Sequence, residues 1–227
     1  MSKPPIIDRK TLKTPDAFVQ KGTQWLGSLS RSRVGIWPIL GLGVLLALVF
    51  YGYDLWEEKA EQSAWASYYL ASKKSAPEKW SELAKVQSQW PRSRAGMLAA
   101  VDLGDHSWET GKEESAKAVE WYTKALSYGH LLPIEEQLLL MNRGNAHELE
   151  QKWVESLADY EKAYSLSGPA KGLALFNRAR VQELKGEKEK ALETYQKVSS
   201  EFASSEFGKQ AKTSWRRLKS PLLNPGG

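Results

Sequence analysis

LLLMNRGNAHELEQKWVESLADYEKA (residues 138–163) is matched thirty-five residues later by LALFNRARVQELKGEKEKALETYQKV (residues 173–198). At this constant offset nine positions carry the same residue, namely Leu138/Leu173, Leu140/Leu175, Asn142/Asn177, Arg143/Arg178, Glu148/Glu183, Leu149/Leu184, Leu157/Leu192, Tyr160/Tyr195 and Lys162/Lys197. In both segments apolar residues recur at helical spacing, and a short polar turn divides the segment in two. The sequence therefore contains an internal repeat whose unit is a pair of helices.

A weaker echo links residues 83–95 to residues 195–207, where the aromatic pair Trp90/Phe202 and the serine pair Ser93/Ser205 keep one spacing. Proline and glycine punctuate the chain after residue 54, and no segment shows the alternating, β-branched pattern of a strand. We therefore predict an all-α fold, with helices at 54–74, 77–90, 93–110, 113–128, 133–150, 153–166, 169–185, 187–201 and 204–219.

Several of these helices carry their own start signals. Ser93 is placed to cap the helix that follows Pro91, because a serine hydroxyl accepts hydrogen bonds from backbone N–H groups in the first turn. Pro77, Pro133 and Pro169 suit a first helical turn, where the missing N–H group costs nothing.

The second helix of each repeat carries a small residue, an aromatic residue and another small residue at one spacing: Ser156, Tyr160, Ala163 and Ala191, Tyr195, Val198. Together with the Asn142-Arg143-Gly144 turn of the first helix, this pattern resembles the tetratricopeptide-repeat family. The resemblance implies an α-solenoid in which no helical pair buries its apolar face alone. Over residues 54–219 it implies about four helical pairs and a C-terminal capping helix at 204–219, with residues 220–227 as a loose tail.

An uncharged run of twenty residues, VGIWPILGLGVLLALVFYGY (residues 34–53), precedes the repeats. At about 1.5 Å per residue it forms a helix about 30 Å long, which matches the hydrocarbon core of a bilayer. Thirty-three residues before the run exceed the short basic segment of a cleaved signal peptide. We predict one retained N-terminal transmembrane helix, in contact with lipid through residues 34–53.

The charges on either side of this run indicate its orientation. Residues 1–33 hold seven basic and two acidic side chains, whereas Asp54, Glu57 and Glu58 follow the run. Because positively charged flanks stay in the cytoplasm, we expect residues 1–33 to form a basic cytoplasmic tail and the domain after Asp54 to lie outside. Within the tail, residues 15–29 place Phe18 and Trp25 on one face and are expected either to form an interfacial helix or to be disordered.

The tail also accounts for the whole net charge of +5, because the remaining residues hold equal numbers of basic and acidic side chains. The composition therefore gives no support for nucleic-acid binding. The chain has no cysteine, and its three histidines do not have the spacing of a metal motif. No nucleophile, phosphate-binding or dinucleotide motif is present. We expect no enzyme activity, catalytic residue, cofactor, metal or small-molecule substrate.

The layout of a basic tail, one span, the segment AWASYYLA (residues 64–71), a Trp90-Pro91-x-Ser93 turn and two further repeats resembles the YfgM-like proteins. These are membrane-anchored tetratricopeptide proteins that act as ancillary subunits of the SecYEG translocon. The resemblance implies a single-pass protein of the bacterial inner membrane with a periplasmic C-terminal domain. Its implied partners are translocon subunits, periplasmic chaperones and newly exported chains.

In such a stack the first helix of each pair lines a concave surface that binds extended peptides. By register, the residues expected on this surface are Met141, Asn142, Asn145, Phe176, Asn177 and Arg180. Amide and guanidinium groups there would donate hydrogen bonds to a peptide backbone or carboxylate. The alternative is structural: Asn142 and Asn177 would bond between neighbouring helices and Arg180 would be a solvated charge.

The anchor and the repeats together predict a membrane-anchored scaffold that binds proteins, and the resemblance to the YfgM-like proteins implies that it does so at the Sec translocon. Two alternatives remain open at this point. One is a cell-envelope coordinator in division or outer-membrane assembly, although such proteins tend to be cleaved or lipidated. The other is an accessory subunit of an envelope enzyme, which a deep pocket holding a perturbed carboxylate pair would favour.

Overall fold

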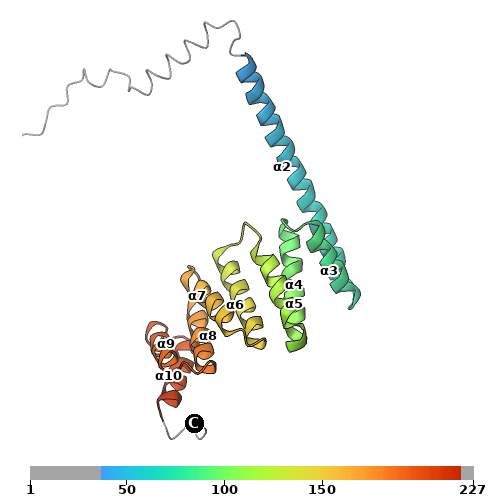
Figure 1. Ribbon diagram of the computed structural model, residues 1–227. Coiled ribbons are helices and arrows are strands. Elements are labelled where there is room, and N and C mark those ends of the chain that lie inside the picture. Colours follow the sequence, from blue (N-terminus) through green and yellow to red (C-terminus); the bar gives the residue numbers. More distant parts are fainter. Residues whose placement is uncertain (1–36, 221–227) are drawn as a thin grey trace, which may run out of the picture. The chain divides into compact units, whose positions relative to one another are not determined.

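The structure, a computed structural model, describes residues 37–220, and every regular element in that range is helical (Figure 1). The elements are α2 (Trp37–Ser72), α3 (Glu78–Gln89), α4 (Arg94–Glu109), η2 (Lys112–Glu114), α5 (Ser115–Leu126), α6 (Pro133–Leu149), α7 (Trp153–Ser165), α8 (Lys171–Leu184), α9 (Lys188–Glu201) and α10 (Glu206–Lys219). The predicted all-α class is confirmed. The helix expected at 15–29 and the tail after Ser220 lie outside the described residues.

Helix α2 runs without interruption through the predicted end of the membrane span at residue 53. Residues 54–71 contain neither proline nor glycine, so nothing stops the helix until the polar segment before Pro77. Among the described residues, one helix, α2, is long enough and apolar enough to cross a membrane. The chain divides into two units after Glu58, and the placement of the domain boundary at 53/54 stays a prediction.

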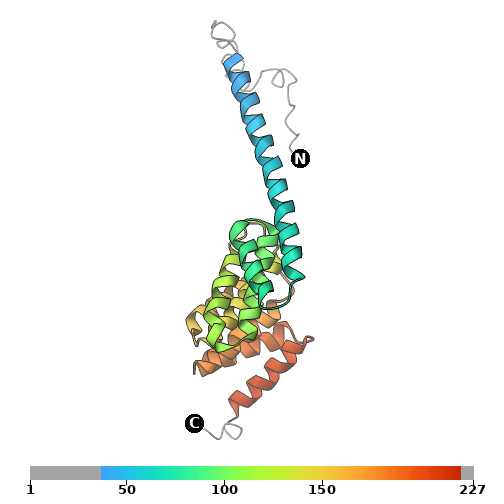
Figure 2. The ribbon, with the colours of Figure 1, turned by 90° about the vertical axis from the view of Figure 1, so that its right-hand side faces the viewer.

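Within the second unit, residues 59–220, each helix from α3 onward packs chiefly against its neighbours in the chain. Figures 1 and 2 show α3 to α10 following one another in chain order. Four hydrophobic clusters lie along this stack, and each one draws on three consecutive helices: α2–α3–α4, α4–α5–α6, α6–α7–α8 and α8–α9–α10. The first helix of one pair therefore completes the core of the pair before it, as in a solenoid.

In two of the helical pairs, α4–α5 and α6–α7, a tyrosine ring of the second helix lies on a glycine of the first. A Cβ atom built on Gly104 of α4 would lie 2.7 Å from the ring of Tyr122 of α5, and one on Gly144 of α6 would lie 2.8 Å from the ring of Tyr160 of α7. Both rings are buried. The ring thus occupies the space that a side chain on the first helix would take.

Two helices of the stack begin with the same cap. The Ser93 hydroxyl accepts from the Gly96 N–H group at 2.9 Å, and the Ser205 hydroxyl accepts from the Gly208 N–H group at 3.1 Å. The predicted cap at Ser93 is confirmed, and the echo that pairs it with Ser205 corresponds to a shared helix start.

Of the three helix starts predicted at prolines, one is confirmed and two are shifted. Pro133 opens α6 as predicted, whereas Pro77 precedes the first residue of α3 and Pro169 lies two residues before α8 begins. The helix expected at 113–128 consists of the 3₁₀ turn η2 followed by α5, because Gly111 at φ 99° forces a sharp entry.

Replacing Gly144 with leucine tests the ring contact. Leucine forms helices better than glycine, so any loss reflects overpacking against the buried Tyr160 ring. We expect Gly144→Leu to lower the free energy of unfolding by about 2 kcal/mol, measured by urea unfolding of the detergent-solubilised chain. The matched control is Gly129→Leu, since no neighbour lies within 4 Å of a Cβ atom there. Equal stability of the two variants would contradict this account.

Candidate functional site

Three of the six residues expected on the peptide-binding surface contribute to the interior. Met141 is buried in the α6–α7–α8 cluster, and Asn177 of α8 is also buried. Phe176 is partly buried, and its ring centroid lies 5.8 Å from that of Tyr195. These side chains stabilise contacts between helices, and only a small part of each reaches solvent.

The other three residues reach the surface but do not form one site. Asn142 and Asn145 of α6 line a pocket of about 170 Å³. Arg180 lies one repeat further along, in an ion pair with Glu148. The structure therefore brings two of the six expected residues together in one concave feature.

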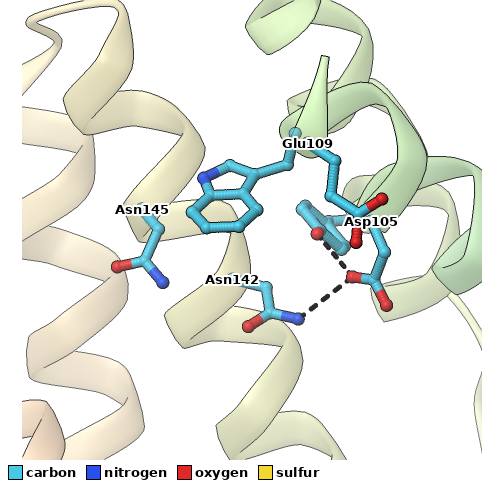
Figure 3. Close-up of a pocket in the computed structure, with 6 residues that line it drawn as sticks. Asp105, Glu109, Asn142 and Asn145 are labelled. Atoms are coloured by element: carbon cyan, nitrogen blue, oxygen red, sulfur yellow. Dashed lines mark hydrogen bonds between the residues drawn. The ribbon is translucent and has the colours of Figure 1, made fainter. Parts of the chain in front are cut away.

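Helices α4, α5 and α6 build this pocket, which is lined by Asp105, Trp108, Glu109, Tyr122, Asn142 and Asn145. Figure 3 shows Asp105 and Glu109 reaching in from α4, opposite Asn142 and Asn145 on α6. The spacing of Asp105, Trp108 and Glu109 places them on one face of α4, since residues three to four apart are neighbours on a helix.

A hydrogen bond at the floor of the pocket fixes the position of one carboxylate. The Tyr122 hydroxyl donates to Asp105 Oδ1 at 2.6 Å, and Asn142 Nδ2 approaches the same oxygen at 3.4 Å (Figure 3). Burial, followed by the hydrogen bond to Asp105 and the charge of that group, raises the pKa of Tyr122 above its usual range. The hydroxyl therefore stays protonated and holds Asp105 in place as a hydrogen-bond acceptor.

The pocket carries uncompensated negative charge. Among residues 37–220, no lysine or arginine lies within ion-pair distance of Asp105 or Glu109. Trp108 is 43% exposed, whereas tryptophan side chains are on average largely buried. The described residues contain no group of three potential metal ligands. Carboxylates, amides and an exposed indole make this a site suited to binding hydrogen-bond donors and cations.

The corresponding position one repeat later is filled by an ion pair. Arg180 donates to Glu148 through both terminal nitrogens, at 2.6 and 2.7 Å, and the Tyr160 hydroxyl donates to the same carboxylate. Burial opposes the charge of Arg180, but the hydrogen bond and charge of Glu148 outweigh it and hold the pKa of Arg180 above its usual value. Arg180 is thus part of the stack, and not the solvated charge of the alternative interpretation.

Sequence reasoning did not identify Asp105, Trp108, Glu109 and Tyr122 as members of one site. The feature that could have identified the site is the glycine under each tyrosine ring, because Gly104 lies under Tyr122 as Gly144 lies under Tyr160. Aligning on these glycines would have placed Asp105 at the position of Asn145. The extra turn around Gly111 shifts the register of the second helix relative to the first and hides this match.

Two arginines of α8 offer a comparison of ion pairs. Arg180→Ala leaves Glu148, which is 11% exposed, without its cationic partner. We expect the free energy of unfolding to fall by about 1–2 kcal/mol, because a partly buried carboxylate loses two charge-assisted hydrogen bonds. Arg178→Ala, the control, breaks a pair whose glutamate is 54% exposed and should cost less than about 1 kcal/mol. Urea unfolding measures both, and equal losses would contradict the assignment.

Comparison with known proteins places the fold but not the family. No model of a protein family matches the chain, and no curated protein matches it in sequence. Two crystal structures of nearly identical TPR-like repeats from a putative kinesin light chain of Podosopora anserina, one of them a variant, match with a TM-score of 0.51 and 12% identity. Each match covers 71% of this chain and 84% of the other. At this identity the likeness establishes a shared TPR-like helical fold and nothing about function.

Proposed function

We propose that this protein is a membrane-anchored scaffold whose TPR-like domain binds other proteins. The observation that carries the proposal is the open pocket between α4 and α6, which is lined by an exposed indole and by two carboxylates that have no lysine or arginine partner among the described residues. TPR-like stacks typically serve protein interaction and not catalysis. We accordingly assign the pocket to recognition, with no enzyme activity and no cofactor.

The anchor in this proposal is the apolar part of α2. Its large side chains between Trp37 and Trp56 are exposed in the isolated chain, which favours burial in lipid. The excess of lysine and arginine in residues 1–33 supports a cytoplasmic N-terminus. With that orientation the repeat domain is extracytoplasmic, and in a bacterium it lies in the periplasm at the inner membrane.

The finer part of the proposal concerns the process that the scaffold serves. The order of tail, span and repeats resembles the YfgM-like proteins, which favours a role at the Sec translocon. In this role the domain contacts translocon subunits and periplasmic chaperones and helps to hand over newly exported chains. This assignment rests on the resemblance alone and is separable from the scaffold itself.

A reporter fused after Gly227 tests the orientation. Alkaline phosphatase folds into its active form only outside the cytoplasm, so we expect phosphatase activity in cells that carry this fusion. A green fluorescent protein fusion at the same position, exported by the same route, should be dark. Fluorescence together with absent phosphatase activity would overturn the extracytoplasmic placement.

Site-specific photocrosslinking tests the scaffold and its process. A photoreactive amino acid in place of Trp108 should form covalent adducts with partner proteins in intact membranes. The control position is Val154 of α7, which is 67% exposed and lies outside the pocket. Translocon subunits or periplasmic chaperones in the Trp108 adducts would support the export role, whereas division or outer-membrane assembly factors alone would contradict it. Identical adducts at both positions would contradict the pocket as the binding surface.

A further inference from the structure

The three complete pairs of the stack share a tyrosine whose hydroxyl donates to a carboxylate on the preceding first helix. The pairs are Tyr122 with Asp105 at 2.6 Å, Tyr160 with Glu148, and Tyr195 with Glu183 at 3.0 Å. In every case burial comes first among the causes that raise the pKa of the tyrosine. A tyrosine–carboxylate bond therefore occurs in all three pairs, although the carboxylate lies one residue after the small residue in the first pair and four residues after it in the other two.

At two of the three positions a guanidinium group from the next helix completes this bond. Arg180 of α8 binds Glu148, and Arg217 of α10 binds Glu183 with an Nη2 to Oε1 distance of 2.6 Å. The carboxylate thus accepts from a tyrosine on one side and from an arginine on the other. Two charge-assisted contacts of this kind hold successive pairs together.

At the first position the arginine is missing. Alignment on the small residues under the rings places Asn145 where Arg180 stands in the next repeat, and Trp108 where Glu148 and Glu183 stand. Asparagine is too short to span the gap that arginine spans. The open pocket is lined by Asn145 and Trp108, the residues that this alignment places at the positions of Arg180 and Glu148.

We propose that this pocket takes the arginine side chain of an extended partner segment, whose guanidinium group binds Asp105 and Glu109 and lies against the Trp108 ring. The partner residue would do at this position what Arg180 and Arg217 do within the chain. The inference rests on the proposed scaffold function and names the chemistry that the scaffold recognises.

The size of the pocket fits a single side chain. Its volume of about 170 Å³ lies below the range of roughly 300–1,000 Å³ typical of small-molecule sites. A pocket of this size suits the head group of one long side chain.

The lining groups favour arginine over lysine. A guanidinium group is planar, donates to two acceptors at once and stacks on aromatic faces, whereas an ammonium group is a compact and strongly hydrated point charge. Asp105 is held by the Tyr122 hydroxyl, and the exposed Trp108 offers an aromatic face beside it. An indole face near a cation adds a favourable cation–π contact.

The binding test uses the full chain in dodecylmaltoside micelles and N-acetyl-L-arginine amide as the probe. The indole N–H signal of Trp108, assigned with Trp108→Phe, is followed by NMR during the titration. We expect a saturable shift with a dissociation constant of about 1 mM, the affinity expected for a single side chain. N-acetyl-L-citrulline amide, which is neutral and nearly the same shape, should give no saturable shift, and the lysine analogue should bind at least about threefold more weakly.

Three variants locate the site. Glu109→Gln should weaken arginine binding about threefold or more, and the control Glu189→Gln, an exposed carboxylate on α9, should leave the affinity unchanged. Asn145→Arg places an arginine at the position of Arg180 and should abolish binding of the probe while the melting temperature stays equal or rises. Glu109 is exposed, so Glu109→Gln removes no buried group. Asn145 Oδ1 accepts from the Tyr160 hydroxyl at 2.6 Å, and in Asn145→Arg that hydroxyl keeps Glu148 as its acceptor.

Equal binding of citrulline and arginine, or unchanged affinity in a folded Asn145→Arg variant, would overturn the proposal. The scaffold function stands or falls separately. Partner adducts at position 108 without arginine binding would support the scaffold function and contradict the arginine site. Arginine binding without any partner adduct would support the arginine site and contradict the scaffold function.

Discussion

The stack depends on a tyrosine ring that lies on a small residue of the preceding helix. At Gly104 and Gly144 the ring occupies the volume that a side chain would take, so it packs directly on the backbone of the preceding helix. The same ring carries its hydroxyl to a carboxylate at the surface. One residue therefore sets the spacing within a pair and also fixes a charge at the edge of the contact with the next pair.

Because this element is constant, function varies with the residues around it. Where Arg180 or Arg217 is present, the carboxylate forms an ion pair within the chain. Where Asn145 and Trp108 occur instead, the carboxylate faces a pocket. A repeat protein can thus create a binding position by omitting one ion pair, without altering the packing that holds its helices together.

Periodic features could be predicted from the sequence, since they depend only on spacing along one helix or between repeats. The helical pairs, the rings of Tyr160 and Tyr195, and the cap at Ser93 belong to this class. The candidate groove was harder to predict, because register alone does not say whether Met141 points into the core. The ion pair between Arg180 and Glu148 joins residues on successive first helices, and its formation depends on how those helices lie in space. The pocket escaped notice since an inserted 3₁₀ turn shifted the register of its pair.

Helix α10 begins with the same serine cap as α4, and so it starts like the first helix of another pair. No second helix follows it in the described residues, and its exposed side chains include Lys209, Lys212, Arg216 and Lys219. An apolar end would be complementary to the next molecule's stack and would allow head-to-tail growth into filaments. The row of positive charges on α10 makes this end costly to bury against an apolar surface, because the charges would lose their contact with water. The last helix therefore closes the core of the third pair and also disfavours continuation of the stack by an apolar surface at this end.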